Sequence, residues 1–115
     1  MSAQEKRTHP RVPVTLTAHC RIGNRFVRDA LGDLSEGGLY LRTKEKAIEG
    51  TPVRVALALP LADGPRVITL VGNVVRVDRD ARGQAKGLGV SFSGAQIHDV
   101  DRQSLTGFIG SRRAG

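Results

Sequence analysis

Two arginines near the start of the chain could bind a compact anion. Arg7 and Arg11 are four residues apart, in a stretch where Pro10 and Pro13 exclude a helix. Proline lacks an N–H and makes the residue before it extended, so both guanidinium groups lie on an extended arm. Two planar forks on such an arm can close over a phosphate or a purine. An Arg-x-x-x-Arg spacing is common in basic proteins, and a solvated basic tail is the simpler interpretation when the pair is taken alone.

A second group lies in the expected turn over 33–38. Asp33 and Ser35 are two residues apart, so their side chains leave an extended backbone on the same side. A carboxylate accepts from N–H groups such as N1–H and N2–H₂ of guanine, and a hydroxyl can bond a phosphate or a base. Gly37 and Gly38 allow positive φ and a close approach of a ligand to the backbone. The competing interpretation is an ordinary turn stabilised by its Asp and Ser side chains.

The elements that position these groups are short strands. Apolar residues alternate with polar ones over 12–22 and again over 53–59, which is typical of strands with one buried face. A β-branched run over 67–77 contains Gly72, which suggests a bend or bulge there. Six short strands separated by turn signals predict a mainly β fold, either a small closed barrel or a sandwich, and of the two we expect a six-stranded antiparallel barrel.

Only the C-terminal part of the chain has a helical pattern of apolar residues. We therefore expect one domain. Its parts are a flexible arm over 1–11, the barrel over 12–94, a helix over 95–110 and a tail over 111–115.

Composition limits the partners and the compartment. The net charge of +7 and the sequence pI of about 10.8 favour an anionic partner. The chain has no apolar stretch long enough to cross a membrane, and its first residues do not resemble a secretory signal. The single cysteine, Cys20, cannot form an internal disulfide, so we expect the reducing cytoplasm.

The sequence does not indicate an enzyme. The three histidines His9, His19 and His98 have no metal-ligand spacing, so we expect no metal and no cofactor. Cys20 falls on the inward face of the first strand, where a thiol is structural. Ser35 has no neighbouring base, and the glycine pair lacks the ending of a phosphate-binding loop.

Taken together, the two motifs change the interpretation. Arg7-x-x-x-Arg11 followed by Asp33-x-Ser35-x-x-Gly38 resembles the PilZ domain family, the bacterial receptors for the second messenger cyclic dimeric GMP (c-di-GMP). Both motifs are intact, although many family members lack one of them.

The resemblance extends along the chain. The segments 71–76 and 87–92 are similar to the family's long fifth strand and its closing strand, and the match covers about 5–110. It implies a PilZ-type barrel with a C-terminal helix.

The resemblance also implies roles for the motif residues. Arg7 and Arg11 would clamp c-di-GMP, Asp33 and Ser35 would read polar edges of a guanine, and Gly38 would leave room for it. As accessory contacts we expect Lys6 and Gly37. In the family, the residue before the arginine pair influences whether one or two ligands bind, and a lysine there leaves that number open.

The function that follows is a single-domain c-di-GMP receptor, a monomer or homodimer, that signals to an unidentified effector protein. In the family such effectors act in motility, pili, polysaccharide secretion, biofilm formation or regulation. The alternative is a small basic barrel that binds RNA or single-stranded DNA by stacking bases on aromatic rings. Against it, the chain has only four aromatic residues, three of which fit core or helix-packing positions: Phe26, Tyr40, Phe92 and Phe108. A third reading, an adaptor that has lost the nucleotide, is disfavoured by the intact motifs.

Overall fold

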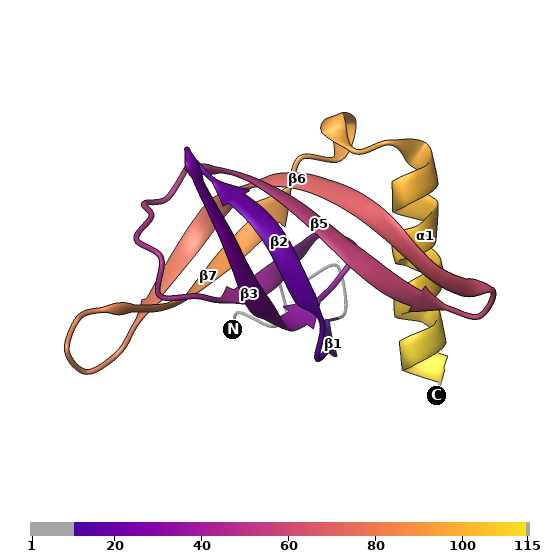
Figure 1. The fold of residues 1–115 in the computed structure, drawn as a ribbon, viewed down its shortest axis with the longest axis horizontal. Coiled ribbons are helices and arrows are strands. Elements are labelled where there is room, and N and C mark those ends of the chain that lie inside the picture. The colour runs from indigo at the N-terminus through magenta and orange to yellow at the C-terminus, as the bar shows by residue number, and fades with distance from the viewer. Residues whose placement is uncertain (1–10, 115) are drawn as a thin grey trace, which may run out of the picture.

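The computed structural model of the protein describes residues 11–114, in which six antiparallel strands close into a barrel (Figure 1). Around the ring the order is β3, β2, β5, β6, β7, β4, and β4 pairs with β3 to close it. The predicted mainly β fold, with a six-stranded barrel and one C-terminal helix, is confirmed. The barrel strands are β2 (Thr17–Ile22), β3 (Arg25–Leu34), β4 (Gly38–Arg42), β5 (Pro52–Leu61), β6 (Gly64–Arg79) and β7 (Ala85–Phe92).

A seventh strand, β1 (Val12–Pro13), lies outside the ring and pairs with the end of β3. The strand expected over 12–22 is thus divided, because residues 14–16 leave the ladder between β1 and β2. There the N–H of Val14 reaches the carbonyl of Gly32 only at 3.5 Å. The predicted alternation of buried and exposed residues nevertheless continues through both strands.

Gly72 does not mark a bulge. β6 pairs with β5 in continuous register past Gly72, and the irregularity lies three residues later, at Val75, where β6 pairs with β7. A Cβ on Gly72 would lie 2.1 Å from the backbone oxygen of Ser91. Two backbones therefore approach closely at this position, and the expectation of a bulge there is wrong.

The helix α1 (Asp99–Ala114) begins later than the expected residue 95. Residues Gly94–Gln96 form a short 3-10 helix, η2, and Ile97 is extended with φ −100° and ψ 129°. The α-helix starts only after this extended residue, with Asp99 and Asp101 in its first turn. Carboxylates there interact favourably with the positive end of the helix dipole.

The helix also continues beyond the expected end at residue 110. The guanidinium of Arg112 lies 5.0 Å from the centre of the Phe108 ring, one turn earlier. This contact supports the last turn within the segment expected to be a frayed tail.

The inner face of α1 packs on one end of the barrel. Leu105, Phe108 and Ile109 are buried in the common core, and α1 contacts β1, β5 and β6. In Figure 1 the helix stands beside the hairpin that joins β5 to β6. Within the described part of the chain, no helix combines the length and the apolar character needed to cross a membrane.

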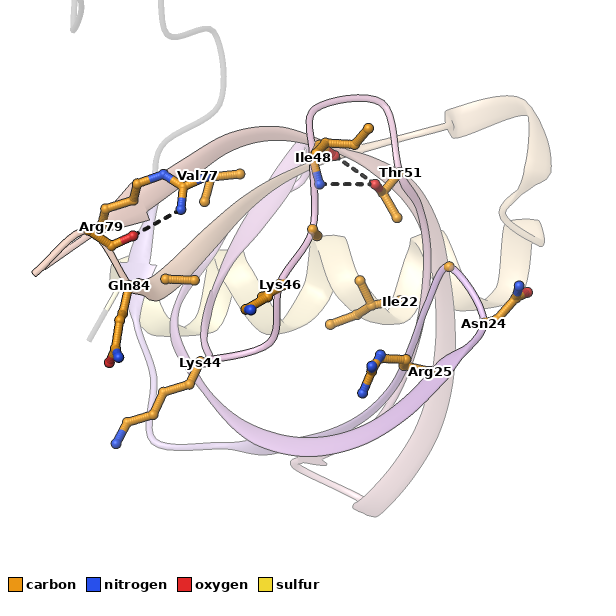
Figure 2. A pocket seen from close by; sticks show the side chains of 14 residues that line it. Ile22, Asn24, Arg25, Lys44, Lys46, Ile48, Thr51, Val77, Arg79 and Gln84 are labelled. Atoms are coloured by element: carbon orange, nitrogen blue, oxygen red, sulfur yellow. Dashed lines mark hydrogen bonds between the residues drawn. The ribbon is translucent and has the colours of Figure 1, made fainter.

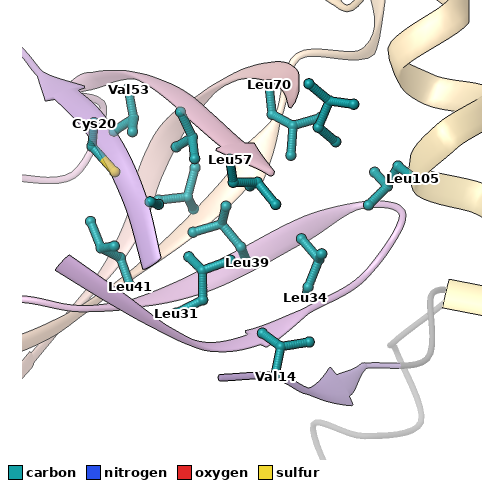
Figure 3. Packing of buried hydrophobic residues seen from close by; sticks show 14 of the residues in the cluster. Val14, Cys20, Leu31, Leu34, Leu39, Leu41, Val53, Leu57, Leu70 and Leu105 are labelled. Atoms are coloured by element: carbon teal, nitrogen blue, oxygen red, sulfur yellow. The ribbon is translucent and has the colours of Figure 1, made fainter. Parts of the chain in front are cut away.

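Leucine, isoleucine and valine side chains fill the barrel interior, as Figure 3 shows for Leu31, Leu39 and Leu41. Cys20 belongs to this core with 3% of its surface exposed, which confirms its predicted inward position. Burial, and to a lesser extent the charge of Asp29, raises the pKa of the Cys20 thiol to about 12. The thiol is therefore protonated near neutral pH and suits a packing role.

Candidate functional site

The two sequence motifs meet at one ion pair. Nη1 of Arg11 lies 3.1 Å from Oδ1 of Asp33, and both side chains remain partly exposed to solvent, at 27% and 30%. The register of β1 on β3 makes this contact possible, because Pro13 lies opposite Asp33 and Arg11 is two residues before it. Residues 22 positions apart in sequence are thus in direct contact.

Arg7 and Lys6 lie outside the described residues. Their predicted roles stay predictions.

The hydroxyl of Ser35 holds the turn between β3 and β4. Its Oγ donates to the backbone oxygen of Gly38 at 3.1 Å, and accepts from the N–H groups of Gly37 at 3.1 Å and Gly38 at 3.0 Å. One donor and two acceptor sites are all that a hydroxyl has, so Ser35 has no free hydrogen-bonding site here. With 3% of its surface exposed, Ser35 shapes the turn rather than facing solvent.

The turn is also tied to the helix. Glu36, its exposed residue, accepts a hydrogen bond of 2.8 Å from the hydroxyl of Thr106 in α1. The N–H of Phe92 on β7 also donates to the carbonyl of Gly37. The turn that carries the Asp33–Gly38 motif is therefore connected to both α1 and β7.

Gly38 is required by packing and not by its backbone angles. A Cβ there would lie 2.2 Å from the backbone oxygen of Val90, since β4 approaches β7 closely where Gly38 pairs with Ser91. The expectation of positive φ at Gly37 and Gly38 is wrong. The described glycines with positive φ are Gly23, Gly50, Gly64 and Gly83.

A row of side chains continues from the ion pair across the outside of the barrel. Asp33 on β3 is opposite Tyr40 on β4, Tyr40 is opposite Gly89 on β7, and Gly89 is opposite Arg76 on β6. Residues directly opposite in a sheet share a face. We call Arg11, Asp33, Tyr40, Gly89 and Arg76 the Tyr40 row.

Tyr40 is fixed in this row by polar contacts. Its hydroxyl donates to Oδ2 of Asp78 at 2.9 Å, and Nε of Arg76 donates to Oδ1 of the same carboxylate at 2.9 Å. The Arg76 guanidinium also lies 5.7 Å from the centre of the Tyr40 ring. The result is a half-buried aromatic ring with a cation on one side and the Arg11–Asp33 pair on the other.

Glycines make room for the ring. A Cβ on Gly87 would lie 1.9 Å from the Tyr40 hydroxyl, and a Cβ on Gly32 would lie 2.9 Å from the ring. Sequence reasoning did not include Tyr40 or Arg76 among the site residues. The alternation of Leu39 and Leu41 already places Tyr40 outward, but its neighbours depend on pairings between distant strands.

Titration of Tyr40 provides a test of this geometry. Burial first, and then the hydrogen bond and charge of Asp78, raise the pKa of Tyr40 above 10.0, against weaker lowering by Arg76 and Arg42. Because Tyr40 is the only tyrosine and tryptophan is absent, ultraviolet absorbance follows it alone. We expect a midpoint above 10.0 in the folded protein and a lower one in Asp78→Asn.

The sign of the linked stability change follows. A pKa raised by folding adds stability that is complete below the unfolded value near 10 and is lost as the pH rises through the folded value. A Tyr40 midpoint unchanged by Asp78→Asn would contradict the hydrogen bond.

A separate hollow lies at an open end of the barrel. It has a volume of about 990 Å³ and is lined by Ile22, Arg25, Lys44, Lys46 and Val77 among others (Figure 2). No member of the Tyr40 row lines it.

Residues 11–114 contain no group of three or more side chains that could hold a metal ion. The Tyr40 row brings two guanidinium groups, a carboxylate and an aromatic ring together on the outside of the barrel, a set of groups that can bind a planar, polar anion.

Comparison with known families agrees with this arrangement. A model of the PilZ domain matches residues 5–111. The chain belongs to the PilZ domain family. The PilZ match spans both motifs and every described strand, together with most of α1.

Solved structures share the fold of this PilZ domain at low sequence identity. The Bacillus subtilis inhibitor of motility MotI/DgrA is 20% identical with a TM-score of 0.80, over 94% of this chain and 51% of that chain. The chain thus spans about half the length of that protein. The PilZ domain with c-di-GMP of YcgR from Escherichia coli is 17% identical with a TM-score of 0.70, over 95% and 92% of the two chains.

A third structure, the K. pneumonia MrkH–c-di-GMP complex, is 18% identical with a TM-score of 0.61, over 95% of this chain and 55% of that chain. A search of curated proteins by sequence finds no match.

Proposed function

We propose that this PilZ domain is a non-enzymatic receptor for c-di-GMP, which binds on the Tyr40 row and requires no cofactor or metal. The observation that carries the proposal is the contact between Arg11 and Asp33, one from each motif, at 3.1 Å on an exposed wall. The c-di-GMP in the YcgR and MrkH structures supports the choice of ligand.

The ion pair suits one edge of guanine. That edge carries the O6 acceptor beside the N1–H and N2–H₂ donors. Arg11 has further N–H donors for O6, and Asp33 has acceptor capacity left for N1–H and N2–H₂. Adenine reverses the pattern at this edge, since its N6 donates and its N1 accepts. The pair therefore favours guanine over adenine.

The remaining residues complete the site. The Tyr40 ring offers an apolar surface to a base, and the Arg76 cation beside it offers charge to a phosphate. In the proposal Arg7 adds the second clamp and Lys6 an accessory contact, while Ser35, Gly37 and Gly38 maintain the turn that positions Asp33.

The domain would act in the cytoplasm, where it passes the signal to an effector protein. The structural similarity to an inhibitor of motility makes motility a reasonable first process to examine, beside pili, polysaccharide secretion and other regulation.

Calorimetry tests the proposal. Titration of the full chain with c-di-GMP should give a saturable isotherm, whose stoichiometry counts the ligands bound per chain. Cyclic AMP and cyclic dimeric AMP should bind at least about tenfold more weakly, since each wrong hydrogen-bonding edge costs about 1–3 kcal/mol. GTP has the correct edge but only one base, so it should also bind more weakly because it makes fewer contacts. Absence of c-di-GMP binding would contradict the proposal. Tighter binding of a short RNA, lost as salt rises, would favour the nucleic-acid alternative.

A further inference from the structure

A second wall of the barrel, away from the Tyr40 row, carries positive charge around an exposed aromatic ring. Phe26 on β3 is opposite Arg21 on β2, and Arg21 is opposite Arg54 on β5. In the next row Arg28 is opposite His19. We call these five residues the Phe26 wall. They line a shallow groove of about 660 Å³ between the strands.

Phe26 is the most exposed large apolar side chain of the described residues, at 81%. The Arg21 guanidinium lies 5.9 Å from the centre of its ring. An isolated exposed phenylalanine would need no explanation, but aromatic and arginine side chains together are the residues enriched at the energetic centres of protein interfaces.

The positive charges of the wall have no acidic partner among residues 11–114. Arg21 and Arg54 are directly opposite each other, an arrangement of like charges that destabilises a sheet. None of the wall's arginines forms an ion pair among the described residues, and none of the described residues lining the groove is acidic. A partner with negative charge would remove this repulsion.

The shape of the barrel decides how such a partner binds. Because the six strands close on themselves, the wall presents side chains and no free strand edge for pairing with another chain. Phe26 is the single large aromatic side chain exposed on this wall, whereas single-stranded nucleic acid is usually held by several stacked rings.

We propose that the Phe26 wall is a docking surface for an acidic protein segment, in which carboxylates pair with Arg21, Arg28 and Arg54 around an apolar residue seated on Phe26. The inference goes beyond nucleotide recognition, and it does not depend on whether c-di-GMP binds. It separates the partner surface from the ligand surface, because the strands of the Phe26 wall and those of the Tyr40 row have only β3 in common.

Selection from a random peptide library on the immobilised full chain tests the docking surface. Selected peptides should combine Asp or Glu with a large apolar residue. Their affinity should fall at least about tenfold in Phe26→Ser and in Arg54→Glu, as expected for residues at the centre of an interface. Binding should also weaken as salt rises.

Matched controls carry the same changes elsewhere. Ile48→Ser removes an apolar side chain that is 75% exposed, and Arg82→Glu reverses an exposed charge in the β6–β7 loop. Neither should change peptide affinity, and c-di-GMP affinity measured on all four variants should equal the wild-type value.

The outcomes that would contradict the docking proposal differ from the one that would contradict nucleotide binding. A library that yields no acidic consensus, or peptides that bind Phe26→Ser and Arg54→Glu as tightly as the wild type, would overturn the proposal. A Phe26-dependent affinity for single-stranded DNA or for anionic phospholipid vesicles, without peptide binding, would assign the wall to another class of partner. If the wild-type protein does not bind c-di-GMP, that result would contradict only the nucleotide-binding proposal.

Discussion

Replacing Arg11 by alanine should lower the affinity for c-di-GMP by more than about tenfold and leave the barrel folded. A hydrogen bond to a charged group contributes about 1.5–3 kcal/mol, and a guanidinium can make two to a phosphate or a guanine edge. The ion pair that Arg11 makes with Asp33 is partly exposed. Its loss should therefore change the free energy of unfolding by only about 0–1 kcal/mol.

Two further variants make the Arg11 result specific. Arg11→Lys keeps the charge but loses the planar fork, so its affinity should fall between those of wild type and Arg11→Ala. Arg82→Ala removes an exposed arginine from the β6–β7 loop and should bind as wild type does. Calorimetry measures all three, with circular dichroism to check folding. A folded Arg11→Ala protein with wild-type affinity would refute the assignment of Arg11.

Replacing Gly38 by alanine should destabilise the protein by about 3 kcal/mol or more, although only one methyl group is added. The new Cβ would lie 2.2 Å from the backbone oxygen of Val90. A backbone atom cannot rotate away as a side chain can, so β4 and β7 would have to separate. Gly38 pairs with Ser91 at the start of this contact, and the β4–β7 pair is part of the closed ring.

Gly107→Ala is the matched control for this change. Gly107 lies in α1 and a Cβ there has no atom within 4 Å, so alanine should stabilise the helix by about 0.5–1 kcal/mol. Urea denaturation compares the two variants. Equal stability of Gly38→Ala and wild type would contradict the close approach. Loss of c-di-GMP binding in an unfolded Gly38 variant would not show that Gly38 contacts the ligand.

The barrel could be predicted from the sequence because the alternation of inward and outward residues is a local pattern within each strand. Strict alternation places Ala18, Cys20 and Ile22 inside, and the same alternation places Val53 and Val55 there. The helix bounds were less accurate, since the extended Ile97 and the Arg112–Phe108 contact are not visible in a periodic pattern.

The site was predictable only in part. The contact between Arg11 and Asp33 agrees with the expectation that the two motifs act together. The packing reason for Gly38 required knowledge of where β7 lies, 52 residues further along the chain at Val90. The saturation of the Ser35 hydroxyl likewise depends on the exact path of the turn. Neither the Tyr40 row nor the Phe26 wall can be found without the register of distant strands.

A two-dimensional ¹H–¹⁵N NMR titration of the full chain with c-di-GMP would locate the ligand on the barrel. The largest amide shifts should occur in the Tyr40 row, at Arg11, Asp33, Tyr40, Gly89 and Arg76. Amide shifts of the Phe26 wall and of the open end of the barrel near Lys44 should change little. Saturable shifts confined to the Phe26 wall or to that open end, with the Tyr40 row unchanged, would contradict binding of c-di-GMP on the Tyr40 row.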